Sequence, residues 1–260
     1  MAYTIKSMST AAATPRSEWS EEEWKVRVQL AACYRIAACA GLTDLVFTHI
    51  TARVPGPEPH FLINPYKTLF TEVTASNLVK IDLDGIIVEP TEHEVNTTGF
   101  VIHSAIHAAR PELHCVWHSH SMAGVAVSAQ LGGLLPITQY AIPFYNRIGY
   151  HRYEGLALDL AERERLVADL GPHPAMILEN HGLITCGRTI PEACAMMLML
   201  DKACQAQVMA QAGGGALIVP PAEICEHAAR QFGAMRGHEE ELEWPALLRM
   251  VREQEADYAR

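Results

Sequence analysis

The sequence predicts a mixed α/β protein whose central sheet is mainly antiparallel, and three observations support this. Short apolar, β-prone runs follow one another in the first third of the chain, and Asp84-Gly85 between two of them is typical of a tight hairpin. Helical patterns with capping residues occur before and after these runs. A length of 260 residues with 49% apolar residues allows a sizeable core, in one large domain or two small ones.

The first half of the chain predicts a helix packed on an antiparallel sheet. Ser20 and Glu23 fit a capping box before an Ala-rich helix that ends near Gly41. Thr97 and Thr98 are expected to cap a second helix over 99–109, which Pro111 ends. The expected strands are 47–54 and 60–64, followed by a hairpin of 78–82 and 86–88.

The second half alternates short apolar runs with helical patterns. Strands are expected at 114–118, 175–179 and 183–186, and helices at 122–130, 157–170 and 191–212, with strand and loop over 134–150. Gly213-Gly214-Gly215 is typical of a linker. We therefore expect a flexible tail over 1–18, one domain over 19–213 and a helical extension over 214–260.

Charge and composition exclude several classes of function. A net charge of −10 and a pI near 5.7 argue against a surface for nucleic acid or anionic membranes. No apolar run approaches the length of a membrane span, and the N-terminus lacks the apolar core of a signal peptide, so we expect a cytoplasmic protein. The seven cysteines are scattered without C-x-x-C spacing, which argues against a thiolate zinc site.

Three histidines stand where two predicted strands end. His118 and His120 are two residues apart at the end of an apolar run, so in a strand their side chains leave on one face. His181 follows a second apolar run and precedes a glycine. Three imidazoles with an open position are the pattern of a catalytic metal site, although hydrogen-bonded core histidines remain the alternative.

Two further histidines, His103 and His107, lie four residues apart on the predicted helix 99–109 and share a face. Their spacing is compatible with three roles: metal ligands, hydrogen-bonded residues or solvent-facing residues. The sequence does not choose among these alternatives.

The ordered motifs resemble the class II aldolase/adducin family over residues 22–212. The resemblance rests on the run Gly99-Phe-Val-Ile-His-Ser-Ala-Ile-His-Ala-Ala-Arg-Pro111, on His118-Ser-His120, and on Glu179-Asn-His-Gly-Leu183. It implies a three-layer α/β/α fold with a mainly antiparallel central sheet, and a homotetramer with its active site near a subunit interface. It also implies a divalent ion, commonly zinc, held by His118, His120 and His181; manganese and iron are the alternative ions.

The chain departs from the aldolases of this family at several positions. Their Ser-Ser-Glu, whose Glu is the acid/base, corresponds to Thr97-Thr98-Gly99, and their early Gly-Asn loop corresponds to Thr48-His49. Their phosphate loop corresponds to Asn64-Pro-Tyr-Lys67. Candidates for substrate binding are therefore His49, Asn64, Lys67, Thr97, Thr98 and Arg147. Tyr140 falls where the aldolases place a proton-donating tyrosine, although a packed aromatic is the alternative.

The missing carboxylate favours one kind of chemistry. A divalent ion on neutral imidazoles can bind two substrate oxygens and stabilise an enolate or phenolate. An aldolase in the synthetic direction also needs a base for a C–H proton, and Gly99 supplies none. The sequence therefore predicts decarboxylation, or a retro-aldol cleavage, of a non-phosphorylated hydroxy-acid such as an aromatic one, with Tyr140 or His103 returning the proton. A sugar-phosphate aldolase and a non-catalytic adducin-like binding module are the alternatives.

Overall fold

A computed structural model describes residues 4–5, 16–156 and 161–260 of the chain, and the side chains of Thr97 and Thr98 lie outside this description. The main sheet has seven strands in the order β4-β3-β2-β6-β9-β8-β7. Its strands are β2 (His49–Arg53), β3 (Phe61–Ile63), β4 (Val79–Ile81), β6 (Cys115–Ser119), β7 (Ile148–His151), β8 (Ala175–Leu178) and β9 (Gly182–Gly187). Every neighbouring pair is antiparallel except β7 and β8, which confirms the predicted sheet.

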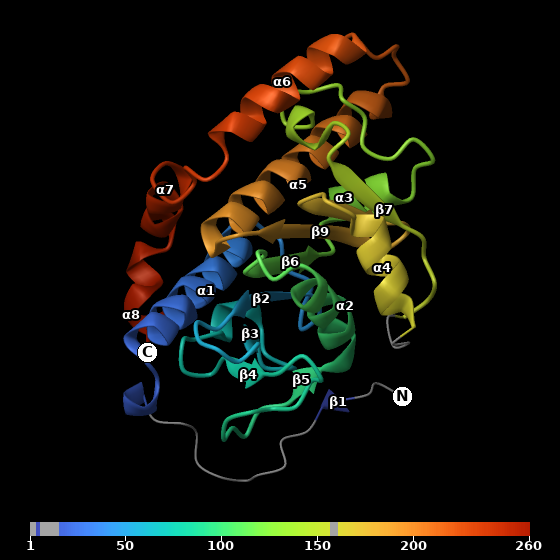
Figure 1. The fold of residues 1–260 in the computed structure, drawn as a ribbon. Helices are drawn as coiled ribbons and strands as arrows, with labels where there is room; N and C mark the ends of the chain where they lie inside the picture. Colours follow the sequence, from blue (N-terminus) through green and yellow to red (C-terminus); the bar gives the residue numbers. More distant parts are fainter. Residues whose placement is uncertain (1–3, 6–15, 157–160) are drawn as a thin grey trace.

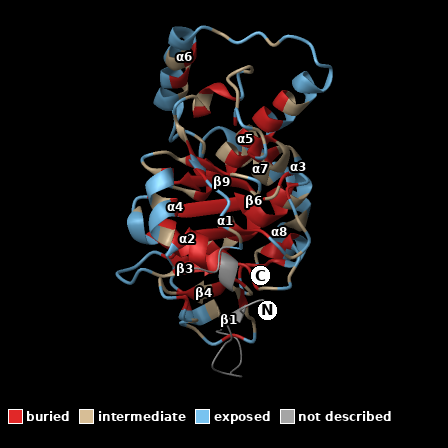
Figure 2. Cartoon of the chain, turned by 90° about the vertical axis from the view of Figure 1, so that its right-hand side faces the viewer, coloured by how far each residue is buried: buried red, intermediate tan, exposed pale blue. Residues whose placement is uncertain are grey.

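The sheet lies between two layers of helices (Figure 1). One face packs against α1 (Glu21–Cys39), α3 (Met122–Ser128) and α5 (Ile190–Ala212), through side chains such as Ile50 and Trp117. The other face packs against α2 (Thr97–Ala109) and α4 (Glu162–Leu170), through Val116 and Ile184. This is the expected α/β/α arrangement, and Figure 2 shows the sheet strands buried, whereas α4 carries exposed surface.

Capping residues define where the helices begin. The Ser20 side chain accepts a hydrogen bond from Glu23 N at 3.0 Å, and Thr189 caps α5 in the same way through Glu192 N at 3.2 Å. The capping box at α1 is half formed, because the Glu23 carboxylate pairs with Arg27 and Lys80 instead. Thr97 and Thr98 lie in the first turn of α2, so the helix begins two residues earlier than the capping pattern predicted.

The predicted hairpin at Asp84-Gly85 is present with a short second arm. Gly85 has a φ of 84°, which a turn glycine adopts without strain. Beyond the turn the pairing with β4 is reduced to one bridge between Ile81 and Ile87, so 86–88 is not a full strand. At the other end of the described chain, Thr4–Ile5 (β1) pairs with Val95–Asn96 (β5). The rest of the expected tail, at 1–3 and 6–15, and residues 157–160 of the expected helix 157–170 lie outside the described residues.

The C-terminal residues form α6 (Ala222–Met235), α7 (Glu243–Met250) and α8 (Glu255–Tyr258). Helix α6 covers the short helix η3 (Ile142–Phe144), where Ile142 packs against Cys225 and Ala229. The chain end returns to α1, because Arg35 pairs with Asp257 at 2.9 Å. The extension therefore crosses the molecule from the η3 loop to α1 (Figure 1).

Candidate metal centre

The strand β6 lies in the middle of the sheet and carries the first two histidines. His118 is opposite His49 of β2 and Ile184 of β9 in the antiparallel register. Because directly opposite residues point to the same face, the His49 and His118 side chains both face α2. His120 follows the last residue of the strand, so its ring stays on the His118 side at the strand end.

His181 comes from the turn between β8 and β9, and the backbone of this turn has special requirements. Asn180 adopts a φ of 57°, a conformation that asparagine tolerates better than most residues. Gly182 passes so close to β6 that a Cβ atom there would lie 2.5 Å from the Ser119 carbonyl oxygen. A glycine after His181 is thus a steric requirement, and it brings the His181 ring to the end of β6.

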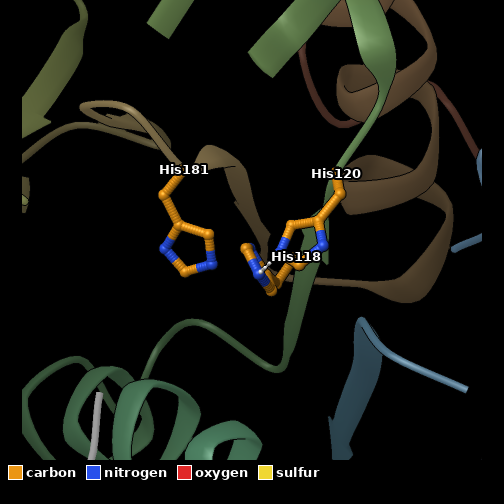
Figure 3. Close-up of side chains that lie close together, drawn as sticks. All are labelled: His118, His120 and His181. Atoms are coloured by element: carbon orange, nitrogen blue, oxygen red, sulfur yellow. Dashed lines mark hydrogen bonds between the residues drawn. The ribbon is translucent and has the colours of Figure 1, made fainter. Parts of the chain in front are cut away.

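The three rings converge on one point, as Figure 3 shows. One nitrogen from each of His118, His120 and His181 can be chosen so that all three lie within 4.8 Å of one another. Their ring centroids are 4.7–4.9 Å apart. Among the described residues this is the one cluster with the spacing of a metal site, and it contains no carboxylate. The predicted ligand set is therefore assembled from two separate parts of the chain.

The hydrogen bonds of the outer ring nitrogens fit a cation. His118 Nδ1 donates to the Leu183 carbonyl at 3.1 Å, and His120 Nδ1 donates to the Asp44 carboxylate at 2.9 Å. A neutral imidazole has one donor and one acceptor nitrogen, so both Nε2 atoms are then left with lone pairs. These two Nε2 atoms lie 2.9 Å apart, an arrangement that a cation between them stabilises.

Burial favours the neutral form of His118 and of His181, and metal ligands must be neutral imidazoles. Desolvation, followed by the neighbouring His181, lowers the pKa of His118 well below its usual value. Burial and then the charge of His120 lower the pKa of His181 to about 4. At neutral pH the ring nitrogens therefore have free lone pairs, and the three-histidine cluster suits a divalent ion.

Asp44 is a site residue that the sequence analysis missed. It lies 76 residues before His120, in the loop between α1 and β2, and fixes the tautomer of that ring. Histidine ligands commonly donate their second nitrogen to a carboxylate in this way. No motif marks Asp44 in the sequence, because its role depends on the return of that loop to the end of β6.

The predicted residues His103 and His49 lie next to the cluster on its α2 side. His103 is buried, its Nδ1 lies 2.7 Å from Thr51 Oγ1, and its ring centroid is 4.3 Å from that of His49. His107 Nε2 reaches the same hydroxyl at 2.8 Å, so the solvent-facing alternative for this pair is wrong. His49 lies 5.3 Å from His118, measured between ring centroids.

Asn64 and Lys67, which correspond to the phosphate loop of the family aldolases, bind other side chains of this chain. Lys67 pairs with Glu94 at 2.9 Å, which raises the Lys67 pKa, and its side chain is largely exposed. The Asn64 side chain is buried and accepts from the Tyr34 hydroxyl at 2.9 Å. The side chains of Thr97 and Thr98 lie outside the described part of the structure.

Two other candidates have contacts remote from the cluster. Arg147 forms a two-pronged ion pair with Glu226 of α6 at 2.6 and 3.0 Å. Tyr140 is half exposed, and the Lys202 ammonium of α5 lies 5.7 Å from its ring. Among the described residues of one chain, neither Arg147 nor Tyr140 contacts the three histidines.

Two described cavities have linings without His118, His120 or His181. One of about 620 Å³ lies between the 137–142 loop and α6. A second, of about 300 Å³, lies beside Asn180 and the Gly132-Gly133 turn. A third cavity, of about 10 Å³, is lined in part by His181. His118 is buried, whereas His120 and His181 are partly exposed, so the cluster lies near the surface of the chain.

The comparison with known proteins agrees with this geometry. The family model of the class II aldolase and adducin N-terminal domain matches residues 28–208. This chain belongs to the class II aldolase/adducin family. A solved aldolase II superfamily protein from Pseudomonas syringae is 50% identical, covers 96% of this chain and all of its own, and superposes with a TM-score of 0.91.

Two other relatives represent different branches of the class II aldolase/adducin family. The L-fuculose 1-phosphate aldolase from Glaciozyma antarctica is 30% identical, with a TM-score of 0.80, over 95% of this chain and 97% of its own. Rat alpha-adducin is 44% identical over 75% of this chain, which corresponds to 27% of the adducin. Within the described residues no helix has the length and apolarity to span a membrane.

Proposed function

We propose that this member of the class II aldolase/adducin family is a divalent-metal-dependent carbon–carbon lyase. Its reaction would be the decarboxylation or retro-aldol cleavage of a non-phosphorylated hydroxy-acid, with aromatic acids as the favoured class. The three-histidine cluster is the observation that carries the proposal, because it is built entirely from neutral ligands and contains no carboxylate among the described residues. Zinc is the expected ion, with manganese or iron as alternatives.

The surroundings of residue 99 support the choice of reaction. The family aldolases have their acid/base glutamate at the position of Gly99, and here the His49 ring lies where such a side chain would begin. When bound, the ion would supply charge stabilisation for a developing carbanion. Loss of carbon dioxide requires no abstraction of a C–H proton, so a site without this carboxylate suits decarboxylation.

The chain's own groups would then return a proton and hold the substrate. His103 is the nearer candidate for the proton, and Tyr140 is the second. Lys67 and Asn64 are occupied by Glu94 and Tyr34, which disfavours recognition of a phosphate group by these side chains. Burial and nearby His49 hold the His103 pKa well below its usual value, so this ring would accept a proton only transiently.

We also propose that the protein is a homotetramer with the site near a subunit interface. The family resemblance suggests this arrangement. The apolar side chains of Met122, two residues after His120, and Leu131, just beyond α3, are exposed in the single chain. Such uncovered apolar side chains beside the partly exposed His120 favour cover by another subunit.

Two alternative functions have specific support. The similarity to L-fuculose 1-phosphate aldolase favours a sugar-phosphate aldolase. The similarity to alpha-adducin favours a binding module without catalysis, although a module has no need of three converging imidazoles.

The test combines metal analysis with a paired substrate screen. Protein purified without chelators should contain one divalent ion per chain, and the loaded protein should release carbon dioxide or an aldehyde from hydroxylated aromatic acids or sugar acids. Dihydroxyacetone phosphate and sugar phosphates should be poor substrates. The His118→Ala variant is the matched control for contaminating activity.

Three results would contradict this proposal. Efficient cleavage of a sugar phosphate would favour the aldolase alternative. Fast exchange of a dihydroxyacetone phosphate C–H proton with solvent would reveal a working base. A folded protein that binds no divalent ion would favour the non-catalytic module.

A further inference from the structure

A group of buried polar side chains lies between β2 and α2, on the inner side of the metal centre. It consists of Thr48, His49, Thr51, His103 and His107, each with less than a twentieth of its surface exposed. The Thr51 hydroxyl links His103 and His107 through hydrogen bonds of 2.7 and 2.8 Å. His103 and His107 thus each have one bonded ring nitrogen, while His103 Nε2 and His107 Nδ1 are buried without a partner among the described residues.

His49 is the histidine of this group that forms no hydrogen bond through its ring to any described residue. Neither of its ring nitrogens has a hydrogen-bond partner among the described residues, although the ring is buried. It stacks obliquely on His103, with ring centroids 4.3 Å apart, and lies across the strand pair from His118. Its ring centroid lies 5.3 Å from that of His118. The ring therefore borders the metal centre with both polar atoms unused.

The backbone on both sides of His49 is adapted to hold the ring there. A Cβ atom at residue 99 would lie 2.9 Å from His49 Nδ1 and 3.0 Å from two ring carbons, so only glycine fits without displacement. Thr48 has a φ of 62°, a strained conformation for a β-branched residue, and its buried hydroxyl also lacks a partner. Strain of this kind is found where the surrounding structure over-determines a functional position.

An imidazole in this position is unfavourable in the free chain. Buried polar atoms without partners reduce stability, whereas an apolar ring of similar shape would have no such penalty. A ligand at the neighbouring cluster is the natural source of the missing partner. The nitrogen atoms of His49 do not belong to the set that converges on the ion, so a hydrogen bond fits its position better than a fourth coordination bond.

We propose that His49 hydrogen-bonds an oxygen atom of an anionic ligand held at the three-histidine cluster, and that Gly99 makes this possible by leaving room for the ring. The inference rests on the proposed function for the presence of the ion. It assigns a ligand class, a small carboxylate with a second oxygen on the adjacent carbon, since a neutral imidazole can donate to an anionic oxygen. A carboxylate at residue 99 would repel such a ligand and collide with His49, so the two positions act as a pair.

The experiment measures binding rather than turnover. Oxalate serves as the probe, because it is a small anion with oxygens on adjacent carbons and is not consumed by aldol cleavage. Its affinity is determined by calorimetry with the cobalt-loaded full-length protein, and the cobalt absorption spectrum is recorded before oxalate is added. The variants are His49→Phe, which keeps a ring without nitrogens, His49→Asn, which keeps a donor, and Gly99→Ala, which crowds the ring.

The half-exposed His173, in the α4–β8 turn, provides the matched control variant His173→Asn. Oxalate affinity should fall about tenfold or more in His49→Phe and in Gly99→Ala, the loss expected for one hydrogen bond to a charged group. It should recover in part in His49→Asn and stay unchanged in His173→Asn. Cobalt content and the oxalate-free spectrum should match the wild type in all four variants, and circular dichroism reports whether each is folded.

Two results would overturn the inference. If His49→Phe binds oxalate within about twofold of the wild type, His49 does not contact the ligand. If the oxalate-free cobalt spectrum of His49→Asn or His49→Phe changes, His49 is a direct ligand instead. Failure of the proposed function is separate, because a protein that binds oxalate through His49 but converts no hydroxy-acid would contradict the lyase assignment alone.

Discussion

The Asp44 carboxylate accepts a hydrogen bond of 2.9 Å from His120 Nδ1, and this contact joins the α1–β2 loop to the end of β6. It orients the His120 ring and leaves its Nε2 facing the His118 Nε2. The metal centre thus depends on a residue far from the histidine motifs in the sequence. The contribution of Asp44 to metal affinity can be measured separately from that of the three histidines.

We expect Asp44→Ala to weaken divalent metal binding about ten- to a hundredfold, the usual effect of losing a group that orients a ligand. Asp44→Asn should have a smaller effect, because an amide oxygen can still accept from His120. Competition with a chromogenic chelator measures both, and Asp84→Ala, an exposed change in the hairpin turn, is the control. Equal affinities for Asp44→Ala and the control would contradict this role of Asp44.

Removal of the ligands themselves should abolish the site. The triple variant His118→Ala, His120→Ala, His181→Ala should lose its bound ion, because each ring provides one of three converging nitrogens. The fold should persist in part, since His120 and His181 lie at the edge of the core. Elemental analysis after gel filtration provides the measurement. Stoichiometric tight binding by the triple variant would show that the ion site lies elsewhere.

The Gly99→Glu variant should be less stable and less active. Its Cβ would approach the His49 ring to 2.9 Å, and overpacking of this kind costs about 1–3 kcal/mol in the free energy of unfolding. Urea unfolding measures the loss, and Gly213→Glu is the control because nothing lies within 4 Å of a Cβ there. Combination with His49→Ala should restore stability. Equal stability of Gly99→Glu and the control would refute the steric pairing.

The pH dependence of stability should report the buried histidines. Burial and then the Arg53 charge lower the pKa of His107 to about 3 in the folded chain, against an ordinary value of about 6.5. Between these values the unfolded chain binds more protons, so the free energy of unfolding decreases as the pH falls from 6.5 towards 3. Each such histidine contributes a slope of about 1.4 kcal/mol per pH unit.

His107→Gln removes one of these titrations while keeping a polar side chain. In chelator-treated protein, urea unfolding between pH 6.5 and 4.5 should therefore give a shallower slope for His107→Gln than for the wild type. At pH 8 the pH dependence of the two proteins should be the same, which serves as the internal control. Identical slopes in the acidic range would argue against a depressed pKa for His107.

The chain should form a homotetramer. The aromatic segment 143–153 is a candidate for the subunit interface. In the structure Tyr145 of this segment packs against the α6 cluster, whereas Tyr150 and Tyr153 remain partly exposed. Light scattering at micromolar concentration should give about four times the 28.6 kDa chain mass. A monomer at that concentration would contradict both the tetramer and the interface near the site.

The sequence by itself determined the sheet, its covering helices and the three converging histidines. These features depend on local patterns: apolar alternation, capping residues, Asp84-Gly85, and paired histidines at a strand end. Each strand, helix and strand-end histidine depends on a few neighbouring residues, whereas the family resemblance implied the layered fold and the common metal site. The sequence also shows that Gly182 follows His181. It does not show why a glycine is needed there, which is the close approach of the Ser119 carbonyl oxygen.

The tertiary structure decided everything that depends on packing between distant segments. It joined Asp44 to His120, directed Arg147 to Glu226 of α6, and placed the His49 ring in the space above Gly99. The sequence analysis treated Gly99 mainly as a missing carboxylate, whereas the fold uses it as room for an imidazole. Spacing along the chain carries no information about such contacts, because they are set by the register of β2 against β6 and by the approach of α2 to the sheet.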